Sequence, residues 1–178
     1  MEDLKDLFTN LDSLLSQTNI EDVTEENTGY SELPEGYYLC EVVKAELKES
    51  KSSHQPMTAF QFKIVENGQT IKNEDEPEFV ELKNTKNRMI FMYYVLKDEG
   101  SVKRFVSDML KFEGEEEGQP LLGKEYFTNS ELLEDALDVL TGMQIYVCIS
   151  SSENQNGETS IWKNLISWKR ADRLGLAV

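Results

Sequence analysis

The strongest constraint on the fold is a long apolar stretch whose pattern changes in the middle. Residues 37–48, YYLCEVVKAELK, are apolar at almost every position up to Val43, and from Lys44 onward only the odd positions stay apolar. Successive side chains of a strand point to opposite faces, so we expect one long strand that is covered on both faces at first and later on one. The first strand of a small closed barrel, which bends between two packed sheets, has this pattern.

A turn precedes this strand and a second strand follows it. Pro34 and Gly36 favour a turn, which places the start of the first strand at Tyr37. A polar loop leads to residues 57–65, whose even positions carry two aromatic rings and an isoleucine, whereas Gln61 and Lys63 are at odd positions. The second strand is therefore expected to bury one face and expose the other.

The rest of the chain reads as further strands and helices. A polar, acidic loop at 69–87, with a short edge strand near 79–82, precedes the apolar run MIFMYYVL. Periodicity does not decide which aromatic side chains of that run face outward. The remaining elements are predicted, in chain order, as strand 89–96, helix 102–112 with Ser101 as N-cap, a helix capped by Ser130 and ended by Gly142, strand 143–149, loop 151–158 and strand 159–168.

The N-terminal segment predicts an acidic amphipathic helix over residues 1–17, followed by an acidic flexible linker over 18–32. Two interpretations stay open: the helix packs on its own domain, or it docks on a partner protein or on a second copy of the chain. Its apolar side chains recur at helical spacing and are Leu4, Leu7, Phe8, Leu11, Leu14 and Leu15.

Length and composition predict one intracellular globular domain. The chain has 178 residues, 39% of them hydrophobic, and no run approaches the roughly 18 apolar residues of a membrane helix. We find no secretory leader, and Cys40 and Cys148, both in apolar strand patterns, are expected to be buried thiols rather than a disulfide.

The formal charge of −16 is unevenly distributed. Residues 1–36, 71–82, 113–117 and 131–138 together carry −21, which leaves +5 for the remainder. Because exposed charges are screened beyond about 8 Å at physiological salt, a basic groove can coexist with an acidic body. The net charge therefore does not exclude an anionic ligand.

The predicted order is three strands, helices and two strands, which is the order of the five-stranded OB barrel. We therefore expect a mainly β protein with helices: an OB-fold barrel over residues 33–170, a helical insertion between its third and fourth strands, the N-terminal helix, and a tail over 171–178. Ligands of that fold lie across the second and third strands, between two loops. Here those loops would be residues 50–56 and 151–158.

The same residues resemble a known family. The segments LPEGYYLCEVVKAELKESKS, MTAFQFKIVENG and LTGMQIYVCISSSENQNGETSIWKNLISW are similar to those of phage proteins regarded as OB-fold single-stranded-DNA-binding proteins, encoded among replication and recombination genes. The resemblance covers about residues 33–168. It implies single-stranded DNA as the partner, the cytoplasm of a bacterial host as the location, and possible replication or recombination proteins as further partners. The acidic insert at 71–87 and the helical leader depart from the usual pattern.

Sequence-tolerant binding of single strands needs aromatic rings that stack on bases and cations that contact phosphates. The candidates on the predicted strands and loops are Lys44, Lys48, Lys51, Lys63, Lys86, Arg88, Tyr93, Trp162, Lys163 and Trp168. Each lysine also fits an ordinary solvated surface. Trp162 and Trp168 share parity with Ile166, so at least one of them also fits the core.

The sequence does not favour an enzyme. His54, the only histidine, lies in a polar loop, and we find no nucleophile motif, phosphate-binding loop or metal-ligand spacing. The adjacent carboxylates at 115–117 are typical of a solvated loop. No cofactor or metal is expected.

A different class remains as the alternative. An acidic phage-encoded inhibitor can imitate DNA by placing carboxylates where phosphates would contact a host protein. In that case the acids of 71–82, 113–117 and 131–138 would form the functional surface, and the lysines would be incidental.

Overall fold

The computed structural model describes residues 11–13, 15–16, 33–71, 78–116 and 118–176. The chain divides into two units, Met1–Leu33 and Pro34–Val178. In the first unit, residues 11–13 and 15–16 are helical, and Leu11 and Leu15 are exposed. The other apolar positions of the predicted N-terminal helix, and the predicted linker at 18–32, lie outside the described residues.

The unit Pro34–Val178 is a mixed α/β structure dominated by an antiparallel sheet of seven strands among the described residues. The strands are β1 (Gly36–Glu49), β2 (Pro56–Ile64), β3 (Gly68–Gln69), β4 (Glu81–Leu82), β5 (Met89–Val95), β6 (Gln144–Glu153) and β7 (Thr159–Ile166). The helices are α2 (Glu99–Met109), the 3₁₀ helix η2 (Lys124–Phe127), α3 (Ser130–Leu140) and α4 (Trp168–Leu174).

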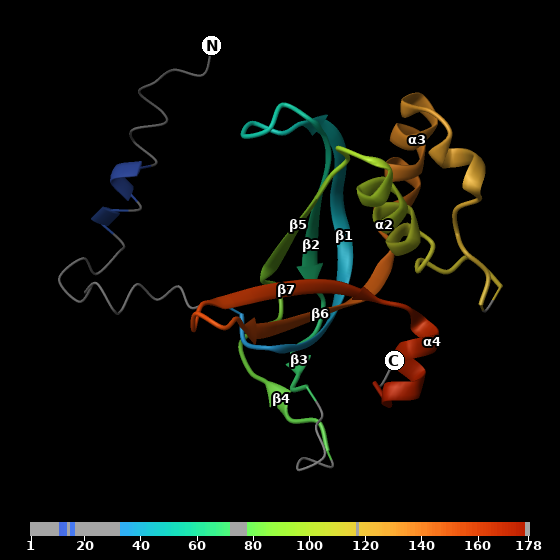
Figure 1. The fold of residues 1–178 in the computed structure, drawn as a ribbon. Coiled ribbons are helices and arrows are strands. Elements are labelled where there is room, and N and C mark those ends of the chain that lie inside the picture. The colour runs from blue at the N-terminus through green and yellow to red at the C-terminus, as the bar shows by residue number, and fades with distance from the viewer. Residues whose placement is uncertain (1–10, 14, 17–32, 72–77, 117, 177–178) are drawn as a thin grey trace. The chain divides into compact units, whose positions relative to one another are not determined.

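β1 is the central strand, and two parts of the sheet share it. Its residues 40–49 pair with β2, and its residues 36–41 pair with β6 on the other side. Figure 1 shows β1 curving from the part with β2 and β5 into the part that β6 and β7 cross. The predicted long strand is confirmed, but it joins two parts of one sheet and not the two packed sheets that were expected.

The predicted closed barrel is wrong, because the sheet is open. The strand order is β4-β3-β1-β2-β5, with β6 on the other side of β1 and β7 beyond β6. No backbone ladder joins β5 to β7 among the described strands. The sheet also gains the hairpin β3–β4, whose second strand confirms the edge strand expected near 79–82.

Two apolar clusters hold the sheet and its helices together. The inward face of β2 buries Phe60, Phe62 and Ile64 completely, and Phe105 of α2 closes over Tyr94 with ring centroids 5.3 Å apart. The second cluster lies at the N-terminal half of β1 and consists of Tyr37, Leu39, Tyr146, Ile166, Ala171 and Leu176. The first cluster confirms the buried face predicted for the second strand.

The end of the last strand and both helix caps differ from the prediction. β7 ends at Ile166, and Ser167 caps α4, so Trp168 is the first residue of a helix. There its indole packs on Tyr146 with ring centroids 5.6 Å apart and is half-buried. α4 also occupies the start of the expected C-terminal tail.

The caps lie upstream of the predicted serines because α2 and α3 begin earlier than expected, at Glu99 and Ser130. Asp98, not Ser101, caps α2 by accepting a bond from the backbone N–H of Ser101, whose hydroxyl accepts from Asp98 in return. Asn129, not Ser130, caps α3 through the N–H of Leu132. α3 ends as predicted, with Gly142 at a φ of +91°.

Cys40 and Cys148 are both free thiols, as expected. Cys40 is buried, whereas Cys148 is half-buried, which corrects the expectation that both are in the core. Within the described ranges, we find no helix with the length and apolar character needed to cross a bilayer.

Candidate nucleic-acid interface

One face of the three strands β1, β2 and β5 carries exposed aromatic rings and lysines. Strand register places the side chains of this face in cross-strand rows, because directly paired residues point the same way. We call this face of β1, β2 and β5 the outer face. Its rows are Glu41, Lys63 and Met89; Lys44, Gln61 and Phe91; Glu46, Ala59 and Tyr93; and Lys48, Met57 and Val95.

A β-bulge decides that the lysines of β1 belong to this face. Val42 pairs with Phe62, but Lys44 pairs with the next residue of β2, Gln61, so Val43 is an extra residue. Val42 is fully buried, and without the extra residue Lys44 would share its face. The bulge therefore turns Lys44, Glu46 and Lys48 outward.

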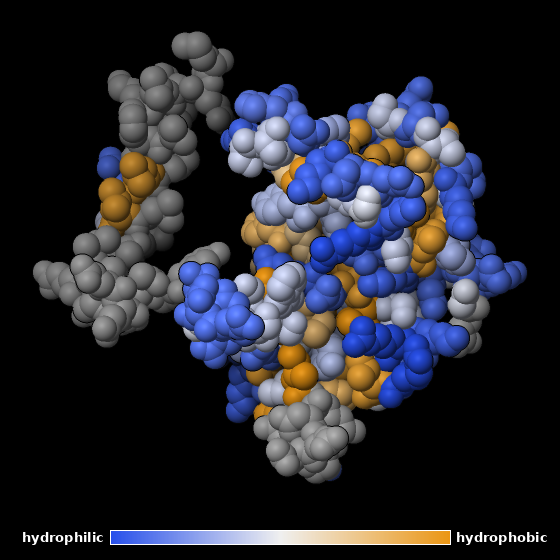
Figure 2. Space-filling model, viewed as in Figure 1, coloured by the Kyte–Doolittle hydropathy of each residue, from blue (hydrophilic) through white to orange (hydrophobic). Residues whose placement is uncertain are grey.

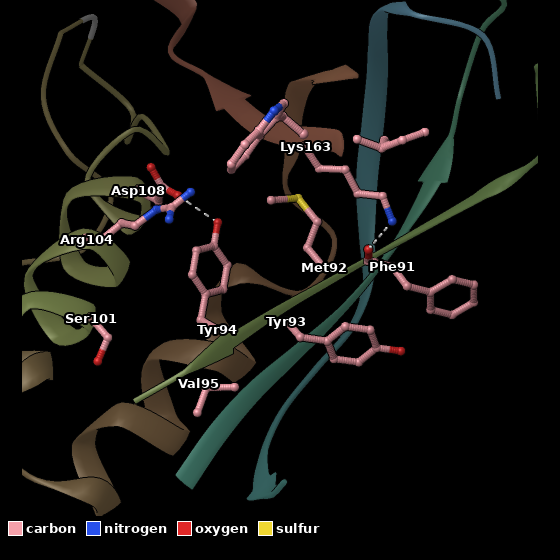
Figure 3. Close-up of a pocket in the computed structure, with 11 residues that line it drawn as sticks. Phe91, Met92, Tyr93, Tyr94, Val95, Ser101, Arg104, Asp108 and Lys163 are labelled. Carbon is pink, nitrogen blue, oxygen red and sulfur yellow. Dashed lines mark hydrogen bonds between the residues drawn. The ribbon is translucent and has the colours of Figure 1, made fainter. Parts of the chain in front are cut away.

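Phe91 and Tyr93 of β5 are exposed to 40% and 57%. Figure 3 shows both rings on one side of β5, pointing away from Tyr94 and from Arg104 of α2. The intervening residue Met92 is buried, as alternation requires. Because both side chains are exposed, their rings are available for stacking on a ligand.

The lysines of the outer face are held only by surface pairs. Glu46 lies 3.7 Å from the ammonium groups of both Lys44 and Lys48, and all three side chains are at least 40% exposed. Lys63 is exposed and pairs across the sheet with Glu41. Exposed ion pairs contribute about 0–1 kcal/mol, so these ammonium groups can be transferred to phosphates at little cost.

Two loops of this unit lie opposite its helices. In Figure 1 the loops at 50–55 and 154–158 project to the left, whereas α2, α3 and α4 lie to the right. Lys51 is exposed in the first of these loops. Figure 2 shows mainly hydrophilic residues in this view, with small apolar patches between them.

A pocket of about 370 Å³ opens at the edge of β5, in the gap between β5 and β7. We call it the seam pocket. Its lining comes from residues 91–95 of β5, from Ser101, Arg104 and Asp108 of α2, and from Ile161, Trp162 and Lys163 of β7. The Lys163 ammonium crosses the gap and donates to the Phe91 carbonyl over 2.9 Å (Figure 3).

The wall that α2 contributes to the seam pocket is polar, and hydrogen bonds join its side chains. The Tyr94 hydroxyl donates to Asp108 over 2.8 Å, and the Lys111 ammonium donates to the other oxygen of the same carboxylate over 2.8 Å. Burial, and after it the Asp108 charge, raises the pKa of Tyr94 well above its usual range. Tyr94 is therefore a neutral hydrogen-bond donor, and the charge of Asp108 is balanced by Lys111.

The structure brings together about half of the site residues predicted from sequence. Lys44, Lys48, Lys63 and Tyr93 share the outer face, and Lys163 lies at its edge. Trp162, which is 46% exposed, lines the seam pocket, and its indole N–H donates to the Ser152 hydroxyl over 2.7 Å.

The other predicted residues lie elsewhere. Trp168 packs against the core, which corrects its assignment to the binding strand. Lys86 is in the turn before β5, where its backbone N–H donates to Asn67 near the hairpin β3–β4. Arg88 directly precedes Met89, and burial raises the pKa of the nearby Tyr38 while the Arg88 charge opposes part of that rise. Neither belongs to the rows of the outer face.

Two residues of this region were not predicted. Phe91 has the same parity as Tyr93 in the run MIFMYYVL. Alternation therefore predicts that Phe91 faces outward once Tyr93 is known to do so. Arg104 lies on the exposed side of α2, and only the packing of α2 beside β5 places it at the pocket.

No protein-family model matches the chain, and no curated protein matches it. Among the described residues, no group of three or more His, Cys, Asp or Glu side chains is placed to hold a metal ion. His54 is exposed, as expected, and contacts Glu49 over 3.0 Å.

Proposed function

We propose that this protein binds single-stranded DNA without strong sequence preference and without catalysis or a cofactor, during phage DNA replication or recombination in the bacterial cytoplasm. The observation that carries this proposal is the outer face, on which Phe91 and Tyr93 are exposed beside Lys44 and Lys48. Every base offers a ring face and every phosphate a charge, so interleaved rings and ammonium groups bind single strands of any sequence.

The topology supports the same proposal. β1, β2 and β5, joined through β1 to β6 and β7, follow the chain order of the five OB strands, with the hairpin β3–β4 and the helices as insertions. On this interpretation the protein is an OB fold opened between its third and fifth strands. The outer face then includes the strands on which that fold holds oligonucleotides.

The test is direct binding of a fluorescently labelled oligothymidine, followed by anisotropy at increasing salt. We expect tighter binding to single-stranded than to duplex DNA, with an affinity that falls as salt rises, because phosphate contacts release counterions. A gel-shift series with single-stranded DNA, RNA and duplex establishes the preferred polymer.

A charge reversal tests the face itself. Lys44→Glu combined with Lys48→Glu should weaken binding at least tenfold and reduce the salt dependence. Lys103→Glu combined with Lys169→Glu is the matched control, since both lysines are exposed on helices outside the outer face. If the variant with Lys44→Glu and Lys48→Glu binds DNA as tightly as wild type does, any DNA site lies on another surface.

One observation favours the acidic inhibitor as a second candidate. α3 carries four exposed carboxylates and no cation: Glu131, Glu134, Asp135 and Asp138. Glu134 and Asp138 line a shallow pocket with Glu46 of β1. A DNA mimic with this surface would capture a DNA-binding host protein and would not bind the oligonucleotide.

The N-terminal segment adds a proposed regulatory role. Its acidic residues either recruit replication or recombination proteins, or compete with DNA for the cationic face, and its leucines could also join two copies. Deleting residues 1–32 separates these roles: competition predicts tighter DNA binding by the shortened chain, and recruitment predicts unchanged DNA binding with loss of a partner.

A further inference from the structure

The seam pocket is reached over the same strand that carries the exposed rings of the outer face. Figure 3 places Phe91 and Tyr93 on one side of β5, and Tyr94, Asp108 and Arg104 on the other. The backbone carbonyl of Phe91 lies between these two sides and accepts a hydrogen bond from the Lys163 ammonium. A chain that passes over Phe91 and Tyr93 can therefore turn over the edge of β5 into the pocket.

The pocket contains positive charge that its own carboxylate does not neutralise. Asp108 is its lining carboxylate, and Lys111 and Tyr94 already satisfy it. Arg104 is exposed, and none of the ion pairs within the described part of the chain includes it. An ammonium has three donors, and Lys163 uses one of them on Phe91, so two remain for an anion.

Trp162 supplies an aromatic wall. It is 46% exposed, and the bond from its indole N–H to Ser152 fixes the orientation of the ring. Tyr94, in contrast, packs edge-on against Phe60 and Phe105, which holds its ring in place. Its hydroxyl donates to Asp108. An exposed ring that lines the same pocket as two cations matches a ligand that combines a planar base with phosphates.

We propose that the seam pocket holds one nucleotide of the bound single strand, with its base against Trp162, one flanking phosphate at Arg104 and the next phosphate at Lys163, since these two cations lie at opposite ends of the pocket in Figure 3. This inference rests on the proposed function. A volume of about 370 Å³ is at the small end of ligand pockets, which span roughly 300–1,000 Å³, and it suits one nucleotide rather than a longer segment. Lys163 then contacts the backbone where the strand leaves the outer face.

Two variants test the pocket against a matched control on the same helix. Arg104→Gln removes the guanidinium, and Trp162→Ala removes the ring; each should weaken oligothymidine binding about tenfold. Lys103→Gln removes a neighbouring exposed charge that does not line the pocket and should leave the affinity within about twofold of wild type. Circular dichroism verifies that each variant is folded.

Nuclear magnetic resonance gives a second readout from the two indole N–H signals. Oligothymidine should shift the signal of Trp162 and leave that of the packed Trp168 unchanged, and Arg104→Gln should reduce the shift at equal concentrations. An unshifted Trp162 signal under saturating oligothymidine would overturn the inference.

Tyr93→Ala distinguishes a failure of the pocket from a failure of the proposed function. If Tyr93→Ala weakens binding while Arg104→Gln and Trp162→Ala behave as Lys103→Gln does, the strand stays on the outer face and the pocket inference is wrong. If wild type does not bind oligothymidine at all, both the proposed function and the inference fail.

Discussion

The ammonium of Lys163 on β7 donates a 2.9 Å hydrogen bond to the backbone carbonyl of Phe91 on β5. A closed barrel would have a backbone ladder between these strands, with a spacing of about 4.8 Å. Here one side chain spans a gap wide enough to leave the seam pocket. The same two residues therefore mark the open edge of the sheet and the meeting point of the two proposed binding surfaces.

Removing the bridge between β7 and β5 should cost little stability. Lys163→Met deletes an exposed hydrogen bond and is expected to lower the free energy of unfolding by about 0.5–1 kcal/mol in urea denaturation. Lys169→Met is the control, because Lys169 is exposed on α4, away from β5. If Lys163→Met lowers the free energy of unfolding no more than Lys169→Met does, the hydrogen bond does not stabilise the contact between β7 and β5.

The exposed rings of the outer face should contribute directly to DNA affinity. Phe91→Ala and Tyr93→Ala are each expected to cost about 1–3 kcal/mol in oligothymidine binding, measured by anisotropy, because each removes one stacking surface. Val80→Ala truncates an equally exposed apolar side chain outside the outer face and should bind as wild type does. The proposal of stacking is rejected if all three variants bind alike.

Stability should fall in alkaline solution. Burial raises the pKa of Tyr38 from 10.0 to about 12 and also raises the pKa values of Tyr94 and of the Cys40 thiol. The folded protein thus holds these protons more tightly than the unfolded chain does. Their stabilising effect is complete below the unfolded pKa values and decreases as pH rises above about 9–10, by about 1.4 kcal/mol per pH unit for each group.

Urea denaturation between pH 7 and pH 11 measures this decline. Cys40→Ala should reduce the decline that begins near pH 9, where unfolded thiols titrate, and should leave the part that the half-buried Cys148 causes and the decline above pH 10 that the tyrosines cause. A free energy of unfolding that stays constant to pH 11 would contradict the prediction.

The cap of α3 gives a test in which sequence and structure disagree. The structure assigns the cap to Asn129, so Asn129→Ala is expected to lower the free energy of unfolding by about 1 kcal/mol. Ser130→Ala, at the position that periodicity had suggested, should change it by no more than about 0.5 kcal/mol. Thermal denaturation of the two variants side by side decides between them.

Much of the sheet could be predicted from local alternation. The buried Phe60, Phe62 and Ile64 and the outward Lys63 follow from period-two patterning, because side-chain direction in a strand depends only on position. The end of β7 could not be predicted in this way. Trp168 continues the alternation of β7, but its packing on Tyr146 favours a helix, a contact between residues far apart in sequence.

The candidate site was predicted less completely than the sheet. Lysine and aromatic positions on one strand could be grouped by parity, as Lys44 with Lys48 was. Their relation to Phe91 depends on the register of β2 against β5, and that of Arg104 on how α2 packs beside β5. Both relations are long-range, so no local pattern encodes them.

The sequence by itself determined the long strands, the helices α2 and α3, the exposed basic residues and the separation of an acidic N-terminal segment, because these depend on neighbours within a few positions. The tertiary structure decided that the sheet stays open between β5 and β7, and that the bulge at Val43 turns the lysines of β1 to the side of Phe91 and Tyr93. Closure and bulging depend on pairing between distant strands, and the free energy of that pairing is set by packing across the whole sheet.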